Sequence, residues 1–279
     1  MTERPVERAG VTLALEEAGE GIPVVLLHGL TATRRYVVMG SKALERSGHR
    51  VAAYDARGHG RSSPAPSADD YAYPTLAADL EAVLDSLELD RAVLAGASMG
   101  AHTIARLALS RPERIAAAVL ITPAHDPEAA EDPGSLARWD ALADGLRQGG
   151  VEGFIEAYGV PDVPEAWQET VVTVLRQRLS AHDHPEAVAD ALGAVPRARP
   201  FETWQDLRAL DVPAAIVGSR DEADPGHPLA IAERWAAELP TARLLVEEPG
   251  KSPLAWQGGQ LSKVIAELAS DAARTGRVG

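Results

Sequence analysis

Residues 96–100, Gly-Ala-Ser-Met-Gly, place a serine between two glycines where the sequence pattern changes. Residues 91–95 are short and apolar, as in a buried strand, and residues 101–109 are typical of a helix. A strand, a tight turn and a helix would hold the Ser98 hydroxyl at an exposed, strained corner, and the glycines fit because Cβ atoms would have no room there. Such a hydroxyl can attack a carbonyl carbon once a base removes its proton.

Two further segments combine a strand pattern with a polar motif. Residues 22–27 form a continuous apolar run that ends in His-Gly-Leu-Thr, and residues 50–54 are followed by Asp-Ala-Arg-Gly-His-Gly-Arg-Ser at 55–62. In this order and spacing, together with residues 96–100, these segments resemble the α/β-hydrolase fold family. The resemblance covers roughly residues 10 to 270 and implies a serine hydrolase.

The strand pattern stops after residues 115–122 and returns only at 212–217 and 243–246, with helical patterns between. The chain is therefore expected to form an α/β fold with a doubly wound, mostly parallel sheet. The resemblance implies that residues 1–123 and 211–279 form the hydrolase core and that residues 124–210 form an inserted helical cap over the serine. Aromatic side chains of the cap are expected to line part of a pocket: Trp139, Phe154, Tyr158 and Trp167.

The resemblance also implies roles around Ser98. The backbone N–H groups of Leu30 and Met99 would hold the oxyanion, and His28 would support its loop rather than transfer a proton. Asp221, in a Gly-x-x-Asp motif after residues 212–217, is predicted as the acid of the triad, with Asp224 in reserve.

The general base is where the sequence departs from the family pattern. Lys251 stands after Gly250, where the family has histidine. A lysine of ordinary pKa near 10.4 is charged at neutral pH and cannot accept a proton, and a neighbouring carboxylate strengthens that preference. The preferred interpretation is an ion pair between Lys251 and Asp221; a Ser-Lys dyad is the alternative.

A histidine of another loop could replace the missing base. His227 is the first candidate, His125 the second and His102, one helical turn after Ser98, the third. The remaining histidines are expected in loops or on the surface: His49, His59, His182 and His184. His182 and His184 could suggest a metal site, but they lack a third ligand nearby.

Composition narrows the function further. The formal net charge of −14 argues against nucleic acid and membrane surfaces as partners, and the absence of cysteine excludes thiol chemistry. The N-terminus has no apolar leader, so a cytoplasmic location is expected. No phosphate-binding glycine motif is present, so no nucleotide cofactor is expected. No metal is expected either, because the histidine pair at 182 and 184 lacks a third ligand.

These observations predict a cofactor-free serine hydrolase of the carboxylesterase type. It would cleave a carboxylic ester, lactone or thioester of a small molecule through an acyl-enzyme on Ser98. The departure at Lys251 leaves one alternative: an inactive or non-hydrolytic member of the fold that binds or rearranges a small apolar ligand. The sequence names neither the substrate nor the oligomeric state.

Overall fold

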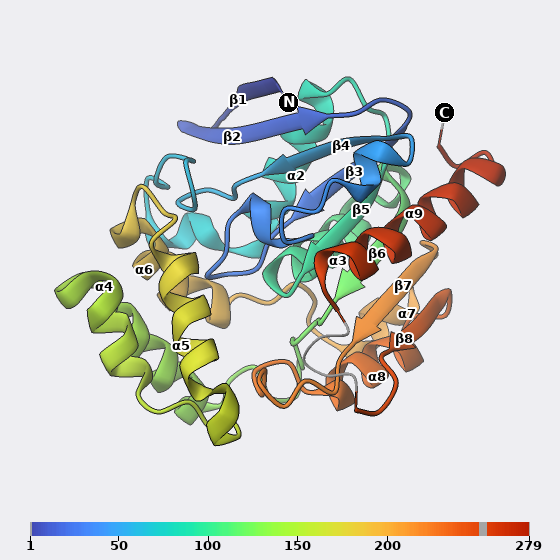
Figure 1. Ribbon diagram of the computed structural model, residues 1–279. Coiled ribbons are helices and arrows are strands. Elements are labelled where there is room, and N and C mark those ends of the chain that lie inside the picture. The colour runs from blue at the N-terminus through green and yellow to red at the C-terminus, as the bar shows by residue number, and fades with distance from the viewer. Residues whose placement is uncertain (1, 251–255, 279) are drawn as a thin grey trace.

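The computed structural model describes residues 2–250 and 256–278 and shows an eight-stranded sheet (Figure 1). The strand order is β1-β2-β4-β3-β5-β6-β7-β8; β1 and β2 run antiparallel to their neighbours and the other strands are parallel. This confirms the predicted fold class. The strands are β1 Thr2–Arg8, β2 Val11–Ala18, β3 Ile22–Leu27, β4 His49–Tyr54, β5 Ala92–Ala97, β6 Ile115–Ile121, β7 Ala214–Gly218 and β8 Ala242–Val246.

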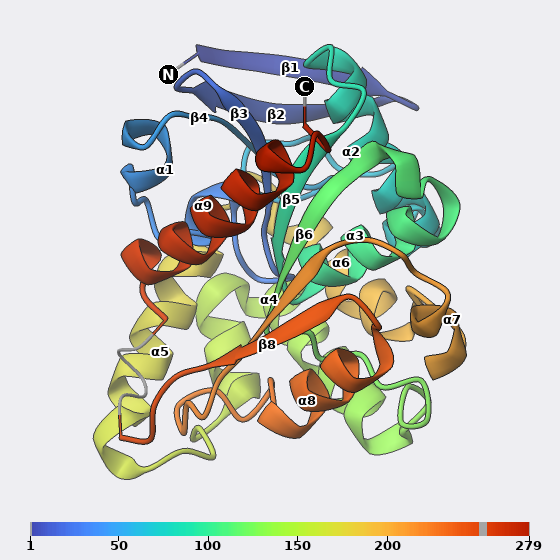
Figure 2. The same cartoon turned by 90° about the vertical axis from the view of Figure 1, so that its right-hand side faces the viewer.

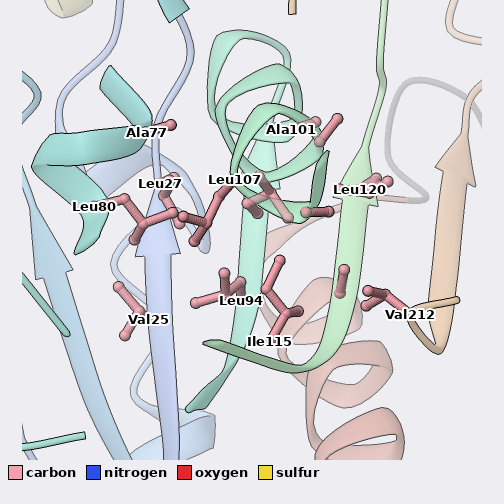
Figure 3. Packing of buried hydrophobic residues seen from close by; sticks show 14 of the residues in the cluster. Val25, Leu27, Ala77, Leu80, Leu94, Ala101, Leu107, Ile115, Leu120 and Val212 are labelled. Atoms are coloured by element: carbon pink, nitrogen blue, oxygen red, sulfur yellow. The ribbon is translucent and has the colours of Figure 1, made fainter. Parts of the chain in front are cut away.

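Helices cover both faces of the sheet (Figure 2). One face packs on α2 (Tyr73–Ser86), α3 (Met99–Ser110), α7 (Trp204–Arg208) and α8 (Leu229–Glu238), and the other on α1 (Ala43–Arg46) and α9 (Gly258–Arg274). Because side chains alternate along a strand, Val25 and Leu27 join the first core and Val24 and Leu26 the second. Figure 3 shows Leu94 of β5 and Leu107 of α3 in the first core. Buried on both faces, these strands contain long apolar runs.

Three helices follow β6 and precede η4 (Val195–Arg197) and α7: α4 (Pro133–Tyr158), α5 (Glu165–Leu179) and α6 (Pro185–Ala194). They share a small core that includes Leu146, Phe154, Leu179 and Leu192. The following segment behaves differently, because its apolar side chains from Phe201 to Leu210 pack into the core against the sheet. The role of the three helices as a cap, and its limits at residues 124 and 210, remain predictions.

Short 3-10 helices complete the described structure: η1 Arg34–Tyr36, η2 Ala68–Tyr71, η3 Pro112–Arg114 and η4 Val195–Arg197. Within residues 2–250 and 256–278, none of the helices has the length and apolar character needed to cross a membrane.

Candidate active site

Ser98 lies at the turn between β5 and α3, as predicted. Its backbone has φ 49° and ψ −111°, a left-handed conformation that costs a non-glycine residue about 1–3 kcal/mol. The turn is held by the Ser98 amide, which donates to the Ile121 carbonyl at 2.9 Å. A Cβ on Gly96 would lie 2.4 Å from the Gly100 carbonyl carbon, and one on Gly100 would lie 2.4 Å from the Leu27 oxygen. Only glycine fits both positions.

The loop after β3 runs directly past the nucleophile candidate. A Cβ built on Gly29 would lie 3.5 Å from Ser98 Cβ. Among the described residues, the Leu30 and Met99 amides have no hydrogen-bond acceptor. Two unused N–H groups therefore flank Ser98, and such groups can stabilise a developing oxyanion.

Three imidazoles hold three consecutive carbonyls of this loop, residues 29–31. His28 Nδ1 lies 2.8 Å from the first carbonyl oxygen, His59 Nε2 lies 2.7 Å from the second, and His182 Nε2 lies 3.3 Å from the third. The first contact matters most, because the Gly29 carbonyl belongs to the same planar peptide unit as the Leu30 N–H. Fixing that carbonyl therefore fixes the direction of the N–H.

His59 and His182 lie in loops, as expected, but both are buried; His49 is buried at the start of β4, so for His49 the expected place in a loop or on the surface was wrong. His182 follows α5 and also accepts from the Gly60 amide at 2.8 Å, while Asp183 N donates back to Gly60 O at 2.9 Å. The loop after β3 thus contacts the inserted helices through His182. Of these four histidines, His184 also lies in a loop and is partly exposed, with 40% of its side-chain surface accessible.

The ring nitrogens of His102 are already occupied. Nε2 accepts from the amides of Ala124 and His125 at 3.0 and 3.1 Å, and Nδ1 lies 2.9 Å from the Tyr73 hydroxyl. Burial holds the pKa of His102 well below its usual value. His125 is held at the Phe201 carbonyl, 3.2 Å from Nε2, and burial lowers its pKa to about 4. His102 therefore has no free nitrogen to serve Ser98.

His227 differs because a carboxylate orients it. Its Nδ1 lies 2.9 and 2.8 Å from the two carboxyl oxygens of Asp224, three residues earlier. Burial raises the Asp224 pKa, but the hydrogen bond and charge of His227 outweigh it and hold this pKa below its usual value. Nδ1 is thus the proton-bearing nitrogen that faces the carboxylate, which leaves Nε2 for a proton transfer.

Asp221 makes a local turn instead, since its Oδ1 accepts from the Ala223 amide at 2.8 Å. Within the described residues it contacts no imidazole. Lys251 lies outside the described residues, so its expected ion pair with Asp221 stays a prediction.

The inserted helices contact the residues predicted for the oxyanion hole. Met99 packs in one cluster with Ala191 and Val195, and Leu30 packs against both this cluster and the core of the inserted helices. Three of the four aromatic side chains proposed for the pocket, at positions 139, 154 and 158, belong to or pack against that helical core. Trp167 is half-buried outside it. Their place in a pocket remains a prediction.

A small cavity lies behind the elbow, lined by residues that include Leu27, His28, Asp79, Met99 and Thr103. Its volume of about 10 Å³ holds one water molecule at most. It cannot admit a substrate.

Known proteins resemble this chain over nearly its whole length. A sequence model of the alpha/beta hydrolase fold matches residues 22–270. A Synechocystis protein named as a non-heme chloroperoxidase is 32% identical over 246 residues, 83% of each chain. A Variovorax paradoxus protein named as a carbamate hydrolase is 31% identical over 205 residues, 73% of this chain and 75% of its own. A thermophilic esterase from Thermogutta terrifontis superposes with a TM-score of 0.75 and 26% identity, covering 98% of this chain and 99% of its own.

Proposed function

The chain belongs to the α/β-hydrolase fold family and its relatives support a hydrolase; from this premise we propose that it cleaves a carboxylic ester, lactone or thioester through an acyl-enzyme on Ser98. One observation carries the proposal. Ser98 sits in a left-handed elbow beside two N–H groups, of Leu30 and Met99, that have no acceptor among the described residues. An acyl carbonyl attacked at this point would place its oxygen between those donors.

We assign the general base to His227 and its orienting carboxylate to Asp224. Both lie in the loop 219–228 after β7, and β7 is separated from β5 only by β6. Strands are spaced about 4.8 Å apart, so this loop needs to reach across about 10 Å.

The reaction then proceeds in two balanced halves. His227 Nε2 takes the hydroxyl proton as Ser98 Oγ bonds to the acyl carbon, and the same proton passes to the departing alcohol or thiol. Water next attacks the acyl-enzyme; His227 takes one of its protons and returns it to Ser98 Oγ, which releases the carboxylic acid. Asp224 holds the imidazole in one tautomer throughout.

The test is p-nitrophenyl ester hydrolysis combined with labelling by a serine-directed phosphonate. The wild type should turn over the ester and take up one phosphonate, and Ser98→Ala should lose both. Ser110→Ala, at an exposed serine of the same helix, should behave as the wild type. Labelling that survives Ser98→Ala contradicts the nucleophile assignment.

One observation favours a second candidate, a member of the fold that binds or rearranges an apolar ligand without hydrolysis. Within the described residues, no imidazole nitrogen lies in hydrogen-bond distance of Ser98 Oγ. Catalytic hydrogen bonds are often long without substrate, so labelling decides: a folded wild type inert to the phosphonate supports this candidate.

A further inference from the structure

Arg178, on α5, is a half-buried cation. Its Nε is buried without a hydrogen-bond partner, and in the described part of the chain its guanidinium forms no hydrogen bond or ion pair. Among the described residues, three other buried nitrogens are unpartnered, in Arg34, His49 and Arg114, and each of these side chains bonds through another nitrogen. The terminal nitrogens of Arg178 are not among the buried atoms and are open to a ligand, whereas burial of Nε without a partner is costly, so the guanidinium calls for an acceptor.

The position of Arg178 relates it to the candidate site. Its guanidinium carbon lies 5.4 Å from the ring centre of Tyr36, on the loop that continues from the oxyanion residues. The charges of Arg178 and Asp224 also act on each other. The stacking on Tyr36 therefore places Arg178 on the side of α5 that faces the segment following the proposed oxyanion residues.

The same side of α5 carries an apolar stripe. Trp167, Val171, Val174 and Arg178 follow one another at helical spacing, and all four are half-buried. None of the three apolar side chains packs into the hydrophobic cores, whereas Leu175 and Leu179 on the adjoining side do. The stripe thus offers apolar surface that ends in a positive charge.

We propose that Arg178 binds an anionic group of the substrate, so that this hydrolase prefers acyl compounds carrying a carboxylate at the end remote from the scissile bond. The inference rests on the proposed function of Ser98. A guanidinium pairs with a carboxylate through two parallel hydrogen bonds, which the five donors of Arg178 can supply. The apolar stripe would hold the carbon chain between the carboxylate and the acyl carbon.

Two other partners for Arg178 fit the structure less well. Asp224 lies outside ion-pair distance of it, and both Asp224 oxygens already contact His227. Stacking on Tyr36 uses the face of the guanidinium and leaves the in-plane N–H groups unmatched. Stacking on Tyr36 therefore orients Arg178 without satisfying its N–H groups.

The test compares two p-nitrophenyl esters of glutaric acid, one with a free distal carboxylate and one with that carboxylate methylated. The wild type should prefer the anionic ester in kcat/KM. Arg178→Gln should reduce the ratio of the two kcat/KM values by about tenfold or more, mainly through KM, because a charge-assisted bidentate contact is lost. Arg178→Lys should restore part of the ratio.

The matched control is Arg176→Gln. Arg176 is two residues away on the same helix and is paired outward with Glu152 at 2.6 and 2.8 Å, so its loss should leave the ratio unchanged. Folding of each variant is checked by phosphonate labelling. The proposal is overturned if Arg178→Gln lowers kcat/KM equally for both esters, which would mean that Arg178 only holds the helices in place, or if the wild type shows no preference.

Binding to Ser98→Ala separates failure of this inference from failure of the proposed function. Glutaric acid mono-4-nitroanilide, titrated by calorimetry, requires no turnover. Its Kd should rise about tenfold or more when Arg178→Gln is added. An unchanged Kd overturns the anion site, whether or not Ser98 is a nucleophile. If the Kd depends on Arg178 but the phosphonate does not label the wild type, only the proposed hydrolase function is overturned.

Discussion

Acid should destabilise this protein steeply, because several histidines are buried in the neutral form. Burial lowers the pKa of His28 and of His182 to about 3 and that of His125 to about 4. An imidazole in the unfolded chain titrates near 6.5. Between that value and the folded pKa the unfolded chain binds more protons, so the free energy of unfolding falls as the pH falls from about 6.5.

The magnitude follows from the two titrations. Between pH 7 and pH 5.5 each of the three groups lowers the free energy of unfolding by about 1.3 kcal/mol, and together by about 4 kcal/mol. That is a large part of the 5–15 kcal/mol that typically separates the folded and unfolded states. His59 and His102 act in the same direction, because burial lowers both pKa values.

His182→Gln isolates one of these contributions. Its side-chain amide can accept from Gly60 and donate to Thr31 without titrating. The loss of stability between pH 7 and pH 5.5 should therefore be smaller than in the wild type by about 1.3 kcal/mol. His184→Gln, at a partly exposed imidazole, is the control and should follow the wild type.

Urea denaturation followed by tryptophan fluorescence at pH 7.0, 6.25 and 5.5 measures the midpoint and the m-value of each variant. The reasoning is refuted if the wild type keeps its midpoint down to pH 5.5. It is also refuted for His182 if the midpoints of wild type and His182→Gln fall in parallel with equal m-values.

Three further predictions concern the site. Asp224→Asn should lower kcat by about 10³-fold or more, because the imidazole loses its orienting carboxylate, whereas Asp221→Asn should lower kcat only a few-fold. Steady-state kinetics of ester hydrolysis measure both values, and the reverse order would indicate Asp221 as the triad acid. Lys251→Ala should leave phosphonate labelling of Ser98 intact, and loss of labelling in a folded variant would indicate a Ser-Lys dyad. Ser98→Gly should abolish labelling yet raise the free energy of unfolding by about 1 kcal/mol, since glycine accepts φ 49° without strain; an unchanged urea midpoint would contradict stored strain at the elbow.

Much of the fold could be predicted because its signals are local. A strand buried on both faces must be apolar throughout, so residues 22–27 and 115–121 are visible without any partner. Helical patterns were expected between residues 122 and 212, and α5 at Glu165–Leu179 is one of the helices found there. Strand β1 has no such signal, since of its seven residues only Val6 is buried and the rest are mainly charged and exposed.

The site was less predictable where distant segments meet. His182 contacts Thr31 across 151 positions of the chain, and its burial depends on how the inserted helices settle on the core. The residues next to His182 in the sequence carry no signal of this contact. The pairing of Asp224 with His227 did have a local signal: Asp-Pro-Gly-His favours a tight turn, and the His227 amide donates to the Asp224 carbonyl at 3.2 Å. The Gly-x-x-Asp motif nevertheless favoured Asp221 over Asp224 as the predicted triad acid.

That turn bears on why lysine could stand at position 251. The family resemblance takes the acid from the loop after one strand and the base from the loop after the next, so the geometry of the pair depends on two loops meeting. In this chain a carboxylate and an imidazole three residues apart share the single loop 219–228, and their contact is set by one turn. With His227 proposed as the base, position 251 is not needed to supply one, so a lysine there is compatible with the proposed proton transfer.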